Sequence, residues 1–243
     1  MSESALPIGP NDPAATDIQD PATRLVWDAD TLRRALDEDT GLRDTGGEVG
    51  AAKGAVLAVL CGLPGTGKSY FARELLKRAP MTVLETDRLR KILVPKPKYT
   101  PAEHARVFTV CHMLIEEYLS QDRRVLFDAT NLTEDARKPM YQMAARLGCP
   151  LVLVGFTAPI DLIKQRLAQR VPGQNPGGFS DADWQIHRRM RPYEQPIQRR
   201  HIIVDTSQDI SWALDRVVDH MSNAAPGYAG CDETAKPRTR LKK

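Results

Sequence analysis

A glycine-rich stretch at residues 62–69 has the residue types that bind the phosphates of a nucleotide. Residues 56–61 before it are short, apolar and partly β-branched, which is typical of a buried parallel strand. The residues from Lys68 onward have apolar side chains at helical spacing. The stretch itself matches G-x-x-x-x-G-K-S, a phosphate-binding loop, in the strand–loop–helix context that the motif requires. The sequence therefore predicts a nucleotide triphosphate site, and the motif alone does not separate a kinase from a GTPase or a motor.

Each residue type in this loop has a physical task. The glycines permit backbone turns that a Cβ would obstruct, so that successive N–H groups point inward at an anion. The helix that follows adds the positive end of its dipole. Lys68 reaches the β- and γ-phosphates, and the Ser69 hydroxyl is a ligand for Mg²⁺. We expect the nucleotide to be bound by Gly62, Leu63, Pro64, Gly65, Thr66, Gly67, Lys68, Ser69 and Tyr70.

Charge is divided unevenly along the 243 residues. Residues 1–50 contain eleven Asp or Glu and four Arg, whereas residues 51–243 contain thirty Lys or Arg and twenty Asp or Glu. A basic body favours phosphorylated ligands, although solvated surface charge would produce the same pattern. The four cysteines are far apart and form no C-x-x-C pair, which argues against a zinc site and a disulfide framework.

Composition divides the chain into a folded domain, expected over residues 54–224, and two extensions. Residues 1–53 are acidic and predicted to be largely disordered, with one possible amphipathic helix over residues 22–39. Residues 225–243 form a basic tail, also predicted to be disordered, that either contacts nucleic acid or is simply solvated. The chain begins with no basic region followed by an apolar core, and no apolar run approaches about 18 residues. We therefore expect no signal peptide, no membrane contact and a cytoplasmic location.

Between these extensions, strands and helices alternate. This alternation predicts an α/β fold with a parallel, doubly wound sheet. Right-handed crossovers bring the carboxyl ends of the strands, and with them the ligand crevice, to one edge. Further strands are expected at 81–84, 124–127, 150–156 and 201–204, and helices at 102–119, 134–147, 160–169 and 210–221.

An acid follows the second expected strand at this edge. Asp87 can face the γ-phosphate and accept a proton from an attacking hydroxyl group. The alternative is that Asp87 caps the next helix. Arg90 lies three residues on, hence on the same helical face, where it could hold an anionic group of the acceptor.

A second acid ends the third expected strand in the sequence FDATNL. Asp128 is placed like the acid that holds Mg²⁺ in phosphate-loop enzymes. Thr130 and Asn131 are expected as polar contacts to the substrate in the crevice. Capping of the next helix by Asn131 or Thr133 is an alternative that is compatible with this function.

The region from residue 164 to residue 191 has the composition of a lid. Arg166 and Arg170 lie four apart on one helical face, and a Pro- and Gly-rich break separates them from a second arginine-bearing helix. Closure of such a lid would bring guanidinium groups onto the transferring phosphoryl group and exclude water. The alternative is a solvated basic face. Arg170 is the residue that we expect to make the catalytic contact.

Taken in order along residues 55–222, these motifs resemble the polynucleotide-kinase-like branch of the P-loop kinases. The matching elements are the loop at 62–69, D-x-x-R at Asp87 and Arg90, D-x-T-N at 128–131 and R-x-x-x-R at 166–170. The resemblance implies a three-layer α/β sandwich with five parallel strands in the order 2-3-1-4-5 and a helical lid. It implies ATP, Mg²⁺ and transfer of the γ-phosphoryl group to a hydroxyl. It further implies that Asp87 is the general base, that Arg90 contacts acceptor phosphate, and that Arg170 and Arg166 contact the donor phosphates.

Three functions are compatible with these residues. The first is a kinase of polynucleotide 5′-hydroxyls. Aromatic residues for base stacking are sparse, however, and the candidates near the expected crevice are Tyr99, Phe179, Trp184 and Tyr193. The second is a kinase of a small hydroxylated metabolite or an antibiotic, because the same scaffold serves such enzymes, including zeta-toxin-like ones. The third is a non-catalytic, nucleotide-binding regulatory ATPase.

Overall fold

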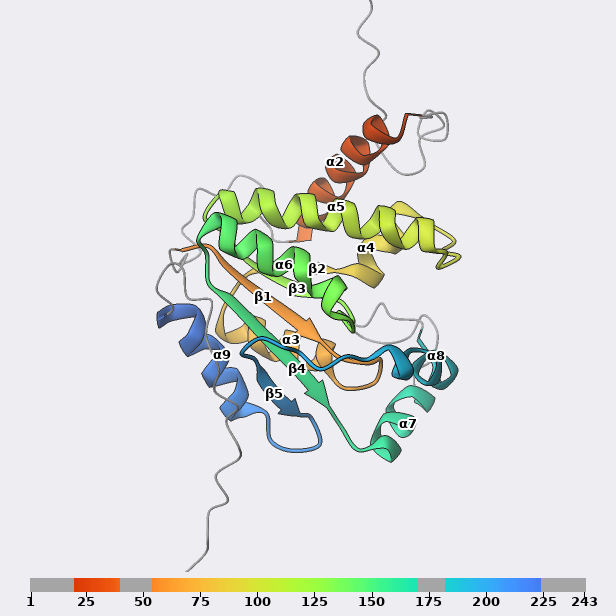
Figure 1. Cartoon of the computed structure of the whole chain (residues 1–243), viewed down its shortest axis with the longest axis vertical. Coiled ribbons are helices and arrows are strands. Elements are labelled where there is room, and N and C mark those ends of the chain that lie inside the picture. The colour runs from red at the N-terminus through yellow and green to blue at the C-terminus, as the bar shows by residue number, and fades with distance from the viewer. Residues whose placement is uncertain (1–19, 40–53, 170–181, 224–243) are drawn as a thin grey trace, which may run out of the picture.

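A computed structural model describes residues 20–39, 54–169 and 182–223 of the chain. These residues contain a sheet of five parallel strands in the order β2-β3-β1-β4-β5, as predicted (Figure 1). The strands are β1 (Val56–Cys61), β2 (Thr82–Glu85), β3 (Arg124–Asp128), β4 (Leu151–Thr157) and β5 (Ile202–Asp205).

Helices cover both faces of this sheet. Leu57 and Val59 of β1 pack with α2, α4, α5 and α6, whereas Val56, Ala58 and Leu60 face α3 and α9. The helices α7 and α8 lie beyond the carboxyl ends of β1 and β4 (Figure 1). The helices are α2 (Pro21–Asp39), α3 (Lys68–Arg78), α4 (Thr86–Leu93), α5 (Pro101–Ser120), α6 (Glu134–Leu147), α7 (Ile160–Ala168), α8 (Trp184–Met190), the short 3-10 helix η1 (Arg191–Tyr193) and α9 (Ser211–Asn223).

The starts of helices α5 and α6 follow from local sequence. Thr100 caps α5 by accepting a hydrogen bond from the Glu103 N–H, and a proline occupies the first turn. Thr133 caps α6 by accepting from the Ala136 N–H, at 3.1 Å. Capping of this helix by Thr133, one of the alternatives that the sequence left open, is therefore present.

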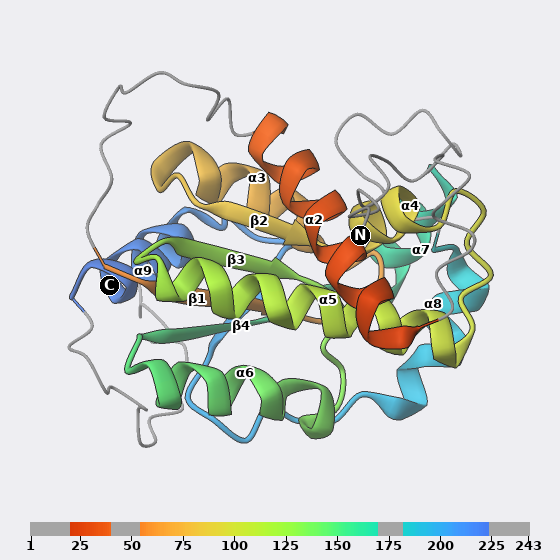
Figure 2. The ribbon, with the colours of Figure 1, turned by 90° about the horizontal axis from the view of Figure 1, so that it is seen from above.

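Helix α2 packs into the main core, although it precedes the predicted folded domain (Figure 2). Trp27 and Leu32 are buried, and the fully buried carboxylate of Asp28 accepts two hydrogen bonds from Arg106 of α5, at 2.5 and 2.6 Å. The expected disorder of residues 1–19, 40–53 and 224–243 lies outside the described residues. The division of the chain at residue 53 therefore stays a prediction.

None of the helices within the described ranges is both long enough and apolar enough to cross a lipid bilayer.

Candidate active site

The phosphate-binding loop joins β1 to α3, and its glycines are required by both conformation and space. Gly65 and Gly67 have φ angles of +85° and +93°, which L side chains rarely adopt. A Cβ on Gly67 would lie 2.9 Å from Thr206 Oγ1, and one on Gly65 would lie 2.9 Å from a methyl carbon of Ile163. The loop is also joined to the segment that follows β3, because the Gly62 N–H donates to the Thr130 carbonyl at 2.9 Å.

Thr206, which follows β5, connects the loop to helix α7. Its hydroxyl donates to the Thr66 carbonyl at 2.8 Å. Arg166 donates to the Thr206 hydroxyl at 2.7 Å and to the Thr206 carbonyl at 2.9 Å. Arg166 therefore lies beside the loop, and its contact with the donor phosphates stays a prediction. Thr206 was not predicted as a site residue, because its only signal in the sequence is a hydroxyl group directly after the fifth strand.

The first turn of α3 places Lys68 and Ser69 at the carboxyl ends of the neighbouring strands β1 and β3. Lys68 Nζ donates to the carbonyls of Gly62 and Leu63, at 2.8 and 3.1 Å. Ser69 Oγ donates to Asp128 Oδ2 at 3.3 Å. The next residue of the predicted binding segment, Tyr70, is 49% exposed.

Asp128 is a buried carboxylate, and its neighbours stabilise the ionised form only in part. Burial raises the pKa of Asp128, and the charge of Asp87 raises it further, whereas Lys68 and Ser69 act in the opposite direction. A cation at this point would stabilise the ionised form. The Ser69 hydroxyl and the Asp128 carboxylate are oxygen ligands of the kind that Mg²⁺ prefers, and Mg²⁺ usually completes its shell with substrate phosphates and water. Residues 20–39, 54–169 and 182–223 contain no cluster of three or more His, Cys, Asp or Glu side chains that could form a cage of protein ligands.

Asp87 lies in the first turn of α4, close to the same edge. The helix begins at Thr86, its N-cap is Glu85, and no side chain caps it. The interpretation of Asp87 as the cap is therefore wrong. Within the described ranges its carboxylate accepts no hydrogen bond, and the Thr86 hydroxyl joins this turn to the Asp128 carbonyl at 3.4 Å. Asp87 is thus an unpaired carboxylate whose charge acts on Asp128.

Arg90 is not presented to the crevice as a free guanidinium group. Its side chain is 4% exposed and forms an ion pair at 2.8 Å with Glu103 of α5, whose side chain is 10% exposed. The guanidinium carbon also lies 5.0 Å from the centre of the Tyr99 ring. Contact of Arg90 with the acceptor stays a prediction, and the structure adds Glu103 as a partner that the sequence did not reveal.

Thr130 and Asn131 line a hollow of about 190 Å³. Asn131 is buried and its amide donates to the Leu60 carbonyl at 2.8 Å, so part of this side chain supports β1. Burial lowers the pKa of the neighbouring His104, and the charge of Arg90 lowers it further, which favours the neutral imidazole. The remaining residues around the hollow are His104, Phe108, Leu132, Thr133, Ala136, Met190 and Tyr193.

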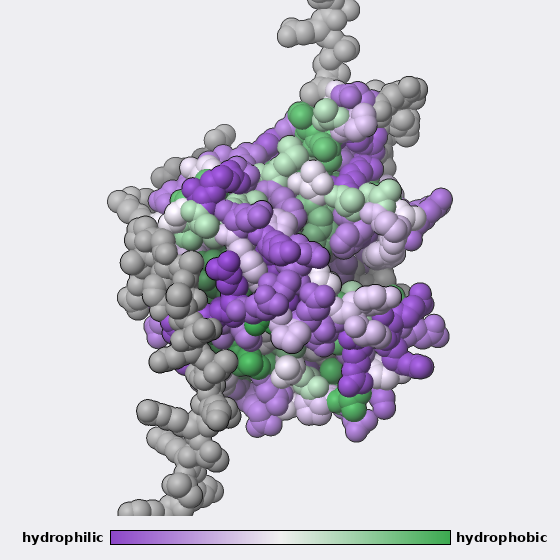
Figure 3. Space-filling model, viewed as in Figure 1, coloured by the Kyte–Doolittle hydropathy of each residue, from purple (hydrophilic) through white to green (hydrophobic). Residues whose placement is uncertain are grey.

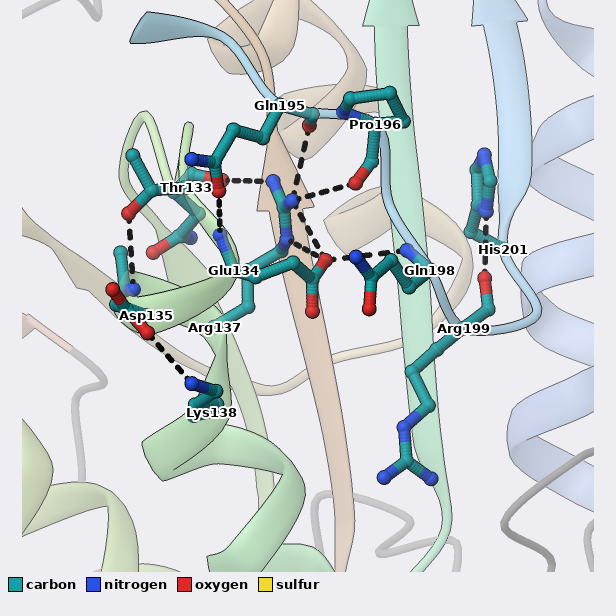
Figure 4. A network of polar contacts seen from close by, with 12 residues as sticks. Thr133, Glu134, Asp135, Arg137, Lys138, Gln195, Pro196, Gln198, Arg199 and His201 are labelled. Carbon is teal, nitrogen blue, oxygen red and sulfur yellow. Dashed lines mark hydrogen bonds and ion pairs between the residues drawn. The ribbon is translucent and has the colours of Figure 1, made fainter.

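A network around Arg137 holds the segment that runs from η1 back to β5 (Figure 4). The buried guanidinium of Arg137 pairs with Glu134 at 2.7 Å and donates to the carbonyls of Gln195 and Pro196, both at 3.0 Å. The Gln195 side chain accepts from the Glu134 N–H at 2.8 Å. These contacts position α8 and η1 next to the hollow. Arg137 could not be recognised from the sequence, because nothing in its local pattern reveals partners about 60 residues away.

Helix α8 also contacts the phosphate-binding loop directly. His187 is buried, and its Nδ1 lies 2.8 Å from the Pro64 carbonyl oxygen. His187 was not among the residues predicted from the sequence, because its partner Pro64 is 123 residues away. Arg170 and the Pro- and Gly-rich break after it lie outside the described residues, so the catalytic contact expected from Arg170 stays a prediction.

The chain is similar in sequence to one protein family and in structure to several kinases. The sequence model of AAA_33, described as an AAA domain, matches residues 57–197. No curated protein matches. A putative kinase from Chloroflexus aurantiacus superimposes with a TM-score of 0.56 at 15% identity, over 68% of this chain and 98% of that one.

Two ligand-bound structures give similar superpositions. The APS kinase CysC of Mycobacterium tuberculosis, in complex with AMPPNP and APS, has a TM-score of 0.51 at 20% identity, over 70% of this chain and 99% of that one. Kti12 of Chaetomium thermophilum, in complex with ADP-AlF3, has a TM-score of 0.52 at 15% identity, over 68% and 98%. At these identities the likeness shows the fold, which is that of the P-loop kinases.

Proposed function

Because the chain belongs to the AAA_33 family of AAA domains and has the P-loop kinase fold, we propose that it transfers the γ-phosphoryl group of ATP to a hydroxyl, most favourably a polynucleotide 5′-hydroxyl. One observation carries this proposal. Asp87, a carboxylate with no hydrogen-bond or ion-pair partner among the described residues, lies at the same sheet edge as the loop lysine and the buried Asp128. A phosphate-loop protein that only binds a nucleotide has no need of a free base at this position.

The residues divide the reaction between them. Loop N–H groups and Lys68 bind the donor phosphates, and Lys68 exchanges its present carbonyl partners for phosphate oxygens. Ser69 and Asp128 would hold Mg²⁺, which supplies charge neutralisation at the transferring group. Asp87 accepts the proton of the acceptor hydroxyl. The hydroxyl oxygen forms a bond to the γ-phosphorus while the bond between that phosphorus and the oxygen bridging to the β-phosphate breaks, and ADP leaves. Arg166, beside the loop, and Arg170 are assigned to the donor phosphates.

ATP is the donor that the comparisons favour. The two superimposed structures hold AMPPNP and ADP-AlF3, both of which are adenine nucleotides. The sugar or base of the acceptor would occupy the hollow at Thr130 and Asn131. The second candidate, a kinase of a small hydroxylated metabolite or an antibiotic, is favoured by the modest volume of that hollow, about 190 Å³.

The proposal is tested by transfer of radiolabelled γ-phosphate from ATP to two acceptors in parallel, a 5′-hydroxyl oligonucleotide and a pool of small metabolites. Wild type should label the oligonucleotide, and Asp87→Asn should lower kcat by about 10² to 10⁴ while ATP affinity is retained, because the role of Asp87 lies in the transition state. Asp135→Asn is the matched control, since that carboxylate is 86% exposed on α6.

Each other outcome favours a different function. Label in the metabolite pool alone would make the chain a small-molecule kinase and would contradict the polynucleotide proposal. ATP hydrolysis with both acceptors unlabelled, and with no effect of Asp87→Asn, would identify a regulatory ATPase and overturn the kinase proposal. Equal losses of turnover and ATP affinity in Asp87→Asn would assign this residue to the donor site instead.

A further inference from the structure

A second, larger pocket lies between α7 and α8, separate from the hollow at Thr130 and Asn131. It is open to solvent and has a volume of about 600 Å³. Three of its side chains are cationic and one is an indole, and this combination is unlike that of the hollow. The described residues that line it are Ile160, Lys164, Trp184, Arg188, Arg191 and Pro192.

The cations of this pocket are available to a ligand. Arg188 and Arg191 are exposed, and neither forms an ion pair within the described residues. Lys164 lies 3.4 Å from Asp161, whose side chain is 90% exposed, and a pair so exposed is weak. In Figure 3 hydrophilic side chains gather over α7 and α8, at the lower right. Among the described residues, no strong ion pair neutralises the positive charge of this pocket.

The indole is held in a fixed orientation. Trp184 stacks on His187 with 5.1 Å between ring centres and 16° between ring planes. His187 in turn contacts the Pro64 carbonyl of the phosphate-binding loop. Lys164 Nζ lies 5.4 Å from the centre of the indole ring. A rigid aromatic ring with adjacent cations is the arrangement by which proteins bind single strands without reading their sequence.

The pocket and the hollow lie along one short segment of chain. Arg188 and Arg191 line the pocket, whereas Met190 and Tyr193 line the hollow. An acceptor whose reactive end occupies the hollow can therefore continue along α8 and η1 into the pocket. A metabolite confined to the hollow would not contact the three cations of the pocket.

We infer that this pocket binds a single-stranded polynucleotide, with phosphodiester groups on Arg188, Arg191 and Lys164 and one base against Trp184. The inference rests on the proposed function, because it places the part of the acceptor strand that lies beyond the reacting 5′ end. The charge of the pocket is complementary to a phosphodiester backbone, and the indole distinguishes this site from a purely electrostatic surface.

The first test is equilibrium binding of a fluorescent 5′-hydroxyl oligonucleotide to the full chain, measured by anisotropy without ATP. Trp184→Ala should weaken binding about tenfold, the effect of losing one stacked base, and Trp184→Phe should restore most of it. Replacing Arg188 and Arg191 together by Ala should reduce the slope of log affinity against log salt by about 0.7 for each phosphate that these side chains no longer neutralise.

Matched controls are present elsewhere on the surface. Trp212→Ala on α9 removes an indole that is 51% exposed, and Lys77→Ala on α3 removes a cation that is 69% exposed. Trp212→Ala should leave oligonucleotide affinity unchanged, and Lys77→Ala should leave both the affinity and its salt slope unchanged. Wild-type affinity and salt slope in the pocket variants would overturn the inference. Displacement of the oligonucleotide by polyglutamate as effectively as by unlabelled oligonucleotide would also overturn it, in favour of an acidic protein segment.

A kinetic test separates this inference from the proposed function. The ratio of kcat/KM for the oligonucleotide to that for a mononucleoside 3′-phosphate should fall about tenfold in Trp184→Ala, because only the longer acceptor reaches the pocket. An oligonucleotide that is phosphorylated equally well by the pocket variants would refute the inference and leave the proposed function standing. Loss of oligonucleotide binding in these variants, with no phosphorylation of any oligonucleotide by wild type, would support the pocket and refute the proposed function.

Discussion

The proposed crevice has a donor side, formed by the phosphate-binding loop, and an acceptor side, formed by α4 and α5. Different kinds of interaction hold these two sides in place. On the donor side the loop is determined by backbone conformation, with glycines at positive φ and a close contact between Gly67 and Thr206. On the acceptor side α4 and α5 are joined by a buried ion pair between Arg90 and Glu103. The conformation of the donor side is therefore set by its main chain, which the side chains of Thr206 and His187 support, whereas the acceptor side depends on an ion pair between side chains.

This difference has a functional consequence. A loop built from main-chain N–H groups recognises phosphate, which all nucleotide triphosphates share. A wall built from side chains can be changed residue by residue without disturbing the loop. We therefore expect the acceptor side to determine the substrate, and the following predictions test whether the two sides are as separable as the contacts indicate.

The largest effect is expected from Lys68→Ala on the donor side. Removing this cation should lower kcat by about 10³ to 10⁵, the range for a single cation at a transferring phosphoryl group. The fold should survive, because the backbone conformation of the loop depends on its glycines and on Thr206. Single-turnover phosphoryl transfer and thermal melting measure the two effects, with Lys77→Ala of the same helix as the control.

Either of two results would contradict this view of the donor side. Retained turnover in Lys68→Ala would remove the proposed mechanism. A large drop in melting temperature would show that the lysine, and not the backbone alone, maintains the donor side.

The next effect is expected from the acceptor side, and it concerns stability. Arg90→Ala and Glu103→Gln should each lower the free energy of unfolding by about 3 kcal/mol, because each leaves a buried polar partner uncompensated. The double change Arg90→Met with Glu103→Leu should recover most of this loss. Urea unfolding of wild type and these variants gives the free energies to be compared.

The surface pair Arg146–Glu116, with side chains 57% and 41% exposed, is the matched control. Its removal should cost less than about 1 kcal/mol. If Arg90→Ala instead unfolds like wild type and only raises the KM of the acceptor, Arg90 is a substrate contact, as the resemblance implied. In that case the acceptor side would not depend on this ion pair for its position.

What the sequence could and could not predict follows the same division. The loop was predicted from neighbouring residues, and the parallel sheet was predicted from the alternation of elements. The strand order came from the resemblance to the P-loop kinases, and the cap at Thr133 was one of the alternatives left open. Thr206 was missed because its partner Thr66 is 140 residues away. Residues such as Arg137, His187 and Glu103 act through contacts that only the tertiary structure brings together.

The prediction for Asp87 shows the limit of local reasoning. A polar residue after a strand suits both a cap and a base, and the sequence did not decide between them. The structure shows that Asp87 is not the cap, because α4 begins at Thr86 and its N-cap is Glu85. In α2, periodicity indicated the helix but not its burial, because the buried Asp28 acquires its partner only from α5.

The smallest effect is expected from Asp128→Asn, at the junction of the two sides. Burial raises the pKa of Asp128 above the ordinary value of 3.8, so the folded protein binds this proton more tightly than the unfolded chain does. The stabilisation that results is complete below pH 3.8 and is lost as the pH rises through the folded pKa. Without nucleotide at neutral pH, Asp128→Asn should therefore raise the melting temperature, and the gain should shrink as the solution is acidified.

Asp135→Asn provides a control of opposite sign. Lys138 lowers the pKa of Asp135, so any stabilisation from this exposed carboxylate is present at neutral pH and is lost on acidification. Melting curves across this pH range, without and with Mg²⁺ and ATP, separate the contributions. Asp128→Asn should also abolish the additional stabilisation by Mg²⁺, because the amide replaces the only carboxylate assigned to the metal. A lower melting temperature than wild type at every pH would show that Asp128 stabilises the fold, and that the two sides of the crevice are joined by a structural residue instead of a metal ligand.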